Sequence, residues 1–326
     1  CWEASDFLDN DGITDKPLEI KVRLTIEENQ MTLDFTGTAK KCSGPVNISL
    51  PTAVATTYVA IKHIFPFLPA NAGVMRPINL IVPDDSLLAT EFPAPTGGYT
   101  ETILRMIDVI FSAFAKAVPE RVVANSYGTI NALSIAGKKD DGSPWVMFSF
   151  YGGGHGASID GDGLNHGNAP ISTATIPPLE ILEAAYPIIF RKWALRPDSA
   201  GPGMYRGGLG AIYEIEVIEK NGAEAFLFGE RSRFPPKGIF GGKPASLNIF
   251  SYEKGKSWVQ PPLGSKMCGI NLPKGKAVRL ETPGGGGYGF TKNRSKKAIA
   301  ADVSRGLVSE READKHFGKA WRKVKI

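Results

Sequence analysis

The sequence predicts a soluble protein of mixed α+β class, with a β-rich second half and several amphipathic helices. Residues 18–26 alternate apolar and polar side chains, which is the pattern of a half-buried strand. Residues 100–119 carry apolar side chains at the spacing of one helix face. The chain has 326 residues, 42% of them hydrophobic, so it can bury a large core. No apolar run approaches the ~20 residues that a membrane helix needs.

Turn residues and apolar periodicity locate the elements of the first half. Asp9 to Gly12 is expected to form a turn before the first strand. Ser49 and Pro51 predict a helix start, because serine caps free amides and proline tolerates the first turn. In order, the expected elements are a hairpin of residues 18–26 and 31–35, a helix over 49–65, a strand over 78–82, a helix over 100–119 and a strand over 145–150.

The second half is expected to hold short strands and a helical tail. Asn221-Gly222 between two alternating segments predicts a hairpin. Ser309 and Glu312 form a capping-box pattern that predicts a helix near the C-terminus, with Gly306 and Gly318 as helix ends. The expected elements are a helix over 178–186, a strand over 188–195, the hairpin strands 212–218 and 225–228, and strands over 247–252 and 277–280. No sharp internal domain boundary is expected.

Residues 186–210 are the stretch around which the chain is organised. An apolar segment runs there directly into Arg196, Asp198 and Arg206, with glycines at 201, 203, 207, 208 and 210 between them. Glycine lets backbone approach closely, and arginine offers a planar fork for a carboxylate or a phosphate. The segment could bind an anion or brace a neighbouring loop, and the brace is the favoured interpretation.

Two further loops are rich in glycine. Residues 151–163 carry His155, whose ordinary pKa near neutrality makes it the best candidate there for proton transfer. His155 and His166, with Asp160 and Asp162, have metal-ligating atoms but no recognised spacing, so no metal is expected in this chain. Residues 283–289 contain four consecutive glycines, which indicate a phosphate nest or a tight chain crossing.

Charge and cysteine content indicate which partners and which cellular compartment to expect. The net charge is +5, and residues 292–326 hold eleven Lys/Arg against four Asp/Glu, so the basicity belongs to the tail. The tail lacks interleaved exposed aromatic residues, so a solvated helical face is favoured over nucleic-acid binding. Three cysteines at no metal spacing are typical of a reducing cytoplasm. Neither a nucleic-acid nor a membrane partner is expected.

Four motifs resemble the hydantoinase B/oxoprolinase family. They are DFTGT at 34–38, the run 151–163, LRPDSAGPGMYRGGLG at 195–210 and PGGGGYG at 283–289. The family includes ATP-dependent N-methylhydantoinases, 5-oxoprolinases and other lactam-opening enzymes, together with acetone and acetophenone carboxylases. This sequence departs from the family at Ala200, where a second glycine is usual, so the turn there is expected to have a negative φ.

The resemblance implies a subunit of an ATP-dependent cyclic amide hydrolase. ATP and Mg²⁺ would be bound by a hydantoinase A-like ATP-binding partner subunit, and the substrate would be a small cyclic amide. Residues 1–326 would be the C-terminal portion of such a subunit, and a divalent metal would belong to a missing N-terminal half. The alternatives left open are a ketone carboxylase subunit and a non-catalytic scaffold that docks the ATPase.

The residues expected to take part in catalysis or in substrate binding fall into two groups. The catalytic candidates are His155, Asp198 and Arg196, which would orient the activated ring and the attacking water. The expected contacts to substrate or to a phosphorylated intermediate come from arginine guanidinium groups and from bare glycine backbone. They are Arg206, Gly207, Gly208, Arg231, Gly285 and Gly286.

Overall fold

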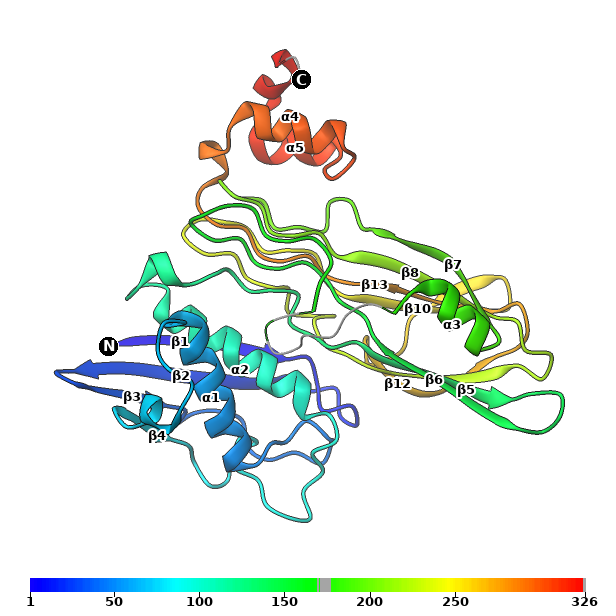
Figure 1. Cartoon of the computed structure of the whole chain (residues 1–326), viewed down its shortest axis with the longest axis horizontal. Coiled ribbons are helices and arrows are strands. Elements are labelled where there is room, and N and C mark those ends of the chain that lie inside the picture. The colour runs from blue at the N-terminus through cyan, green and yellow to red at the C-terminus, as the bar shows by residue number, and fades with distance from the viewer. Residues whose placement is uncertain (169, 171–176, 325–326) are drawn as a thin grey trace.

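The computed structural model describes residues 1–168, 170 and 177–324. Within that part of the chain the fold is mixed α+β, with three sheets and five α-helices, which confirms the predicted class. Figure 1 shows a helix-covered sheet at the N-terminal end, a pair of sheets beside it and a helical arm at the C-terminus.

The N-terminal layer is a four-stranded sheet covered by two helices. Its strands lie in the order β1-β2-β3-β4, and only the β3–β4 pair is parallel. Helices α1 and α2 pack on one face, where alternating residues of β2 such as Ile20, Val22 and Leu24 are fully buried. The elements are β1 Trp2–Leu8, β2 Leu18–Glu27, β3 Gln30–Asp34, α1 Leu50–Ile64, β4 Ile78–Ile81 and α2 Tyr99–Phe114.

The middle of the chain forms a β-sandwich. A five-stranded sheet in the order β11-β10-β13-β8-β7 faces a four-stranded sheet in the order β12-β9-β5-β6. One apolar cluster draws residues from both sheets, for example Tyr213 and Leu133. The elements are β5 Ala132–Lys138, β6 Pro144–Phe150, α3 Leu179–Ala185, β7 Ile188–Leu195, β8 Ala211–Val217, β9 Ala223–Phe228, β10 Ile249–Lys254, β11 Ser257–Val259, β12 Lys266–Leu272 and β13 Ala277–Glu281.

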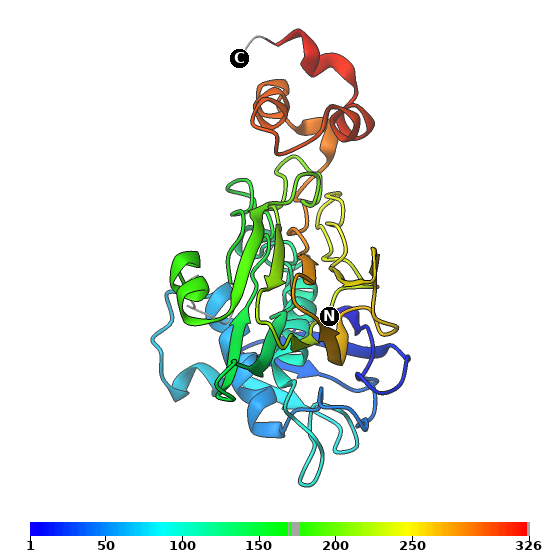
Figure 2. The ribbon, with the colours of Figure 1, turned by 90° about the vertical axis from the view of Figure 1, so that its right-hand side faces the viewer.

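A helical arm at the C-terminus projects from one end of the sandwich (Figure 2). It contains α4 Lys296–Ser304 and α5 Glu310–Phe317, which share a small core of Ile299, Ala300, Ala313 and Trp321. The Ser309 hydroxyl accepts a hydrogen bond from the Glu312 amide, and Gly318 ends α5 with a φ of 70°. The predicted N-cap and helix end are therefore confirmed. The reciprocal half of the predicted capping box is not formed, because the Ser309 amide donates to Asp198.

Most predicted elements are present, but the predicted hairpin around Asn221-Gly222 is wrong. Strand β8 pairs with β7 and β13, whereas β9 pairs with β5 and β12. The turn carries the chain from one sheet of the sandwich to the other, so both strands bury their apolar faces in the same core without pairing. Strands β1, β5, β11 and β12 were not predicted.

Two helix predictions also need correction. Helix α2 has Gly98 at its N-cap position and ends at Phe114, so it is shorter than residues 100–119. Ser49 lies at the N-cap position of α1, but its hydroxyl contacts the Thr52 hydroxyl at 3.0 Å instead of capping an amide. Among the described helices, none is both long and apolar enough to cross a membrane.

Candidate functional site

Three segments distant in sequence cross one another through glycine backbone. We call residues 153–163, 199–210 and 283–289 the glycine crossing. The Gly208 amide donates to the carbonyl oxygen of His155 at 2.8 Å, and the Gly285 amide donates to that of Gly208 at 2.9 Å. The Gly207 amide donates to Gly201 and the Gly286 amide to Asn125, at 3.0 and 2.8 Å. The fold therefore brings His155 and the four predicted site glycines together.

The crossing explains why these positions lack side chains. A Cβ added at Gly207 would overlap the carbonyl oxygen of Gly285, and one added at Gly285 would overlap that of His155. The amides of Gly285 and Gly286 donate to backbone carbonyls, as does that of Gly287, so those hydrogens are engaged within the chain. Of the two interpretations open from the sequence, this geometry is that of a tight chain crossing.

Arg206 lies in a charged network that fastens the helical arm to the crossing. Its Nε donates to Asp302 of α4 at 3.1 Å, and its backbone amide donates to Asp162 at 2.9 Å. Arg294 contacts the same two carboxylates at 2.6–2.8 Å. Burial opposes the ionisation of Asp162, but Arg294 and Arg206 outweigh it and lower the pKa of this carboxyl.

The side chains of Arg196 and Asp198 form hydrogen bonds with different parts of the protein. The Arg196 Nη1 donates to three carbonyl oxygens, those of Leu247, Glu281 and Thr282, at 2.8–3.1 Å. The Asp198 carboxylate accepts a hydrogen bond from the Ser309 amide at 2.7 Å, in front of α5, and its φ is 61°. Ala200 is absent from the positive-φ residues, as predicted. In the described structure no hydrogen bond or ion pair joins the side chains of Arg196, Asp198 and His155.

Burial disfavours the protonated form of two histidines, His155 in the crossing and His166 beside it. His155 Nε2 is buried without a hydrogen-bond partner in the described structure, and burial lowers its pKa. His166 Nε2 lies 2.6 Å from the Tyr213 hydroxyl and accepts from the Trp193 Nε1 at 3.0 Å. Burial likewise lowers the pKa of His166. Within the described residues, no group of three or more His, Cys, Asp or Glu side chains is arranged to hold a metal.

Arg231 is not part of the crossing but lies in a buried cluster between the N-terminal layer and the sandwich. Asn125 joins the two, since it bonds to Gly286 of the crossing and to Asp108 of the cluster. The Arg231 Nη1 contacts Asp6 of β1 at 2.9 Å, and its Nη2 contacts Asp108 of α2. Arg105 of α2 also contacts Asp6, at 3.0 Å. We call Asp6, Arg105, Asp108 and Arg231 the seam cluster. The three-residue spacing of Arg105 and Asp108 on α2 is typical of a solvated helix face, but both are buried because Arg231 and Asp6 pack against that face.

Two buried glutamates adjoin the seam cluster. Glu101 at the start of α2 accepts the Ile130 amide at 3.0 Å, and Glu230 pairs with Lys266. Burial, with the nearby Glu230 charge, raises the pKa of Glu101 to about 8. Burial raises the pKa of Glu230 to about 7, against the opposing charge of Lys266. No local pattern in the sequence predicts the raised pKa of Glu101, because Glu230 lies 129 positions further along the chain.

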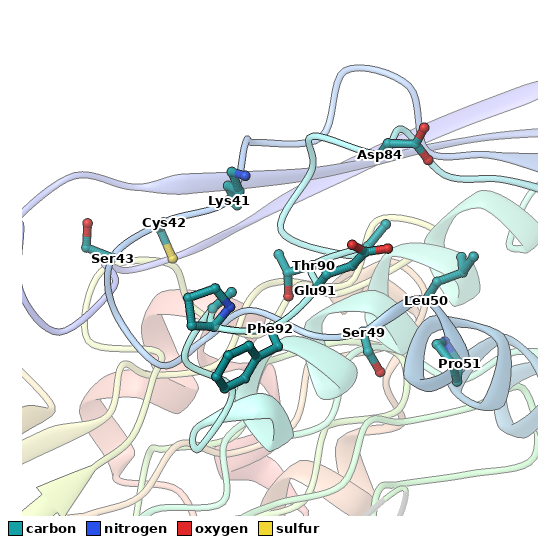
Figure 3. Close-up of a pocket in the computed structure, with 13 residues that line it drawn as sticks. Lys41, Cys42, Ser43, Ser49, Leu50, Pro51, Asp84, Thr90, Glu91 and Phe92 are labelled. Atoms are coloured by element: carbon teal, nitrogen blue, oxygen red, sulfur yellow. The ribbon is translucent and has the colours of Figure 1, made fainter.

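Two cavities of the described structure are compared here with the candidate site. The larger, of about 1200 Å³, is open and contains none of the predicted site residues. Figure 3 shows its walls coming from the loop around Cys42, the start of α1 at Leu50 and the loop around Phe92. The smaller, of about 270 Å³, lies between the crossing and the helical arm. We call it the arm cavity, and it has Asp198 and Arg206 in its wall.

Comparison with known proteins gives consistent matches. A sequence profile described as Hydantoinase B/oxoprolinase matches residues 1–291. An uncharacterized protein of Methanocaldococcus jannaschii is 33% identical over 99% of this chain and 55% of its own length. One subunit of a putative D-/L-hydantoinase from a Pseudomonas species is 26% identical over 96% of this chain and 53% of its own length. The beta subunit of the Pseudomonas jessenii caprolactamase is 30% identical over 77% and 44%.

Two solved structures share the fold. An acetone carboxylase chain superposes with a TM-score of 0.82 at 19% identity, over 97% of this chain and 49% of that one. An ATP-dependent caprolactamase from Pseudomonas jessenii superposes with a TM-score of 0.80 at 21% identity, over 97% and 56%. The chain thus spans about half the length of the first two curated relatives and of both structures.

Proposed function

Because the chain belongs to the hydantoinase B/oxoprolinase family, we propose that it is part of a subunit of an ATP-dependent enzyme that opens a cyclic amide. ATP and Mg²⁺ are bound by a hydantoinase A-like partner subunit in this proposal. The observation that carries it is the profile match over residues 1–291, together with relatives named for hydantoin, 5-oxoproline and caprolactam. All three compounds are cyclic amides.

The chemistry requires activation of an unreactive bond. Resonance makes the amide carbonyl a poor electrophile, and transfer of a phosphate from ATP to the amide oxygen would remove that resonance. Water would then add to the carbon, the ring C–N bond would break with the nitrogen taking up a proton, and a second water would release phosphate from the resulting acyl phosphate to leave the carboxylate. The part assigned to this chain is to position groups around the activated ring and to accept a proton from water. We assign the second role to His155, because burial lowers its pKa and its Nε2 has no hydrogen-bond partner in the described structure. That nitrogen is buried here, so the proposal includes its exposure to water during the reaction.

The other candidate residues hold the backbone in place and are not assigned a step in the reaction. Arg206 and the four glycines hold the crossing that carries His155, through the bonds to Asp302 and among backbone groups. Arg196 joins the segment before β10 to the end of β13 with its three hydrogen bonds. We propose that these are positioning residues, and that Asp198 fixes the start of α5. No role is derived for a divalent metal, since the described residues contain no group that fits one.

The test uses this chain, within its full-length subunit, reconstituted with the ATP-binding partner. Hydantoin, 5-oxoproline or caprolactam should stimulate ATP hydrolysis and yield the ring-opened acid. His155→Gln should lower that turnover about 10²-fold or more while leaving the melting temperature within a few degrees. The isolated chain should not bind ATP tightly, because its glycine loops lack the lysine of a phosphate-binding loop.

The alternatives predict different results. A ketone carboxylase subunit would show ATP turnover on acetone or acetophenone that requires bicarbonate, and none on the cyclic amides. A non-catalytic scaffold would keep full turnover in the His155→Gln variant as long as the subunits still co-purify. Either result would refute the assignment made here.

A further inference from the structure

The outward side of the four-stranded sheet in the sandwich is apolar. Along β6 the side chains of Trp145 and Met147 are buried in the core of the sandwich. Their neighbours Val146, Phe148 and Phe150 point to the other side, where they are 56%, 54% and 42% exposed. The rings of Phe148 and Phe150 contact each other, with 5.0 Å between their centroids. Antiparallel sheets normally carry polar residues on a side that faces water, so this side departs from the usual pattern.

The two neighbouring strands continue the apolar surface. Strand pairing places Ala132 of β5 between Phe150 of β6 and Phe228 of β9, and the rows two and four residues along follow the same register. We call the even-numbered residues of 132–136, 146–150 and 224–228 the outer sheet face. Glu224 is the one charged residue among these nine positions.

The N-terminal layer already covers one corner of the outer sheet face. Gly98, at the start of α2, lies so close to the Phe228 ring that an added Cβ would overlap it. The Nζ of Lys266 lies 5.3 Å from the centre of the same ring. In Figure 1 this sheet forms the lower side of the sandwich, beside the N-terminal layer. The exposed part of the face is therefore continuous with a surface that is buried within the chain.

Strand β6 also forms an edge of this sheet. It is the last strand in the order β12-β9-β5-β6, and among the described strands only β5 pairs with it. Residues 145–150 contain neither a charged residue nor a proline. Proteins normally protect an exposed edge with lysine, proline or a bulge, because its free amides and carbonyls recruit other strands. An edge strand of this composition is typical of one that another segment covers.

The size of the outer sheet face distinguishes between possible occupants. At ~4.8 Å between strands and ~3.4 Å per residue, three strands of five residues cover about 250 Å². A stable complex of separate chains buries about 800 Å² on each partner, so the face by itself is too small to hold a second copy of the chain. A segment of the same polypeptide needs less area, because its covalent connection removes most of the entropy cost of association.

The first two curated relatives and both solved structures are about twice as long as this chain, which spans 49–56% of each. We propose that the outer sheet face and the free edge of β6 are the docking surface for the part of the full-length subunit that lies outside residues 1–326. That part covers them with an apolar surface of its own. The docking does not depend on the proposed amide-opening activity.

The test measures the reactivity of a cysteine placed in the outer sheet face of the full-length subunit. Val146→Cys is a change of small volume, and Lys139→Cys in the exposed β5–β6 turn is the matched control. Each alkylation rate with N-ethylmaleimide is read by mass spectrometry of the peptide and divided by the rate in the unfolded protein. The rate at position 146 should be at least about 10²-fold below that at position 139, because a covered site reacts only on local opening.

Three solutions separate the possible occupants. The subunit is measured alone at micromolar and at nanomolar concentration, and again with its ATP-binding partner. Equal protection of position 146 in all three supports the proposal. Protection that is lost on dilution assigns the face to a second copy, and protection that requires the partner assigns it to the ATP-binding subunit. Either result would overturn the proposal, as would rates at position 146 that match those at position 139 throughout.

A charge substitution provides an independent measurement. Phe148→Asp in the full-length subunit should lower the melting temperature by about 5 °C or more, because a carboxylate would be buried among apolar groups. Lys139→Gln makes the same change in net charge and should shift it by less than about 1 °C. An unchanged or raised melting temperature for Phe148→Asp would contradict a covered face. If this variant yields no soluble subunit, the rates at position 146 decide.

Discussion

Replacing Glu101 by glutamine should make folding stability less sensitive to alkaline pH. Glu101 is 1% exposed, and its pKa is raised from the ordinary value of 4.5 to about 8 by burial and by the charge of Glu230. The native state therefore keeps a proton that the unfolded chain releases above pH 4.5. Consequently this group reduces the free energy of unfolding as pH rises from 4.5 to about 8, after which its effect is constant.

The magnitude follows from the size of the shift. Each pH unit in this window costs about 1.4 kcal/mol, so the interval from pH 5 to pH 8 corresponds to about 4 kcal/mol. Glutamine cannot ionise, and it can still accept the Ile130 amide through its carbonyl oxygen. The difference in unfolding free energy between Glu101→Gln and the wild type should therefore grow by about 4 kcal/mol, in favour of the variant, over this interval.

Guanidinium denaturation at several values between pH 5 and pH 9 measures this difference. The exposed residue Glu120 provides the control, because Glu120→Gln should shift stability by the same small amount at every pH. A Glu101→Gln difference that is equal at pH 5 and pH 8 would mean that Glu101 is ionised in the native protein, and the reasoning from burial would fail.

Three further predictions concern the crossing and its surroundings. Gly207→Val should abolish or sharply reduce soluble yield, because the carbonyl of Gly285 occupies the added space, whereas Lys319→Ala at an exposed position should not. Arg196→Met should lower the unfolding free energy by about 3 kcal/mol, through three unpaired carbonyls, with activity per folded molecule nearly intact. A 10²-fold loss of turnover without destabilisation would contradict that structural role. Arg231→Met should destabilise by about 3–5 kcal/mol in denaturant titrations, since Asp108 would lose its guanidinium partner while Asp6 keeps only Arg105 and Lys237; a change below about 1 kcal/mol would show the cluster to be solvated.

Local patterns in the sequence were sufficient for most individual elements. Alternation over residues 18–26 predicted β2, because a strand between a core and solvent must alternate its side chains. A short apolar run that begins at Ile188 predicted β7. The Ser309 cap of α5 is likewise a short-range hydrogen bond that four consecutive residues define. The motifs at 195–210 and 283–289 also indicated the family, which the profile match confirms.

The pairing of strands that are distant in sequence could not be predicted from such local patterns. The turn at Asn221-Gly222 has hairpin chemistry, yet β8 and β9 join different sheets, because each gains more by pairing with strands from elsewhere in the chain. Likewise Arg105 and Asp108 have the spacing of a solvated face. Their burial depends on Arg231 and Asp6, which lie more than 95 positions away.

The sequence by itself determined the fold class, the family and the need for bare backbone at four site glycines, since each depends on residue type and short-range geometry. Only the tertiary structure decided what those features do. In the folded chain the amides of Gly285 and Gly286 donate to backbone carbonyl oxygens, and Arg196 donates to three more. Asp198 and Arg206 lie in the wall of one cavity. The physical reason is that burial, charge pairing and cavity shape arise between segments that meet only after folding, so their energies are absent from any local pattern.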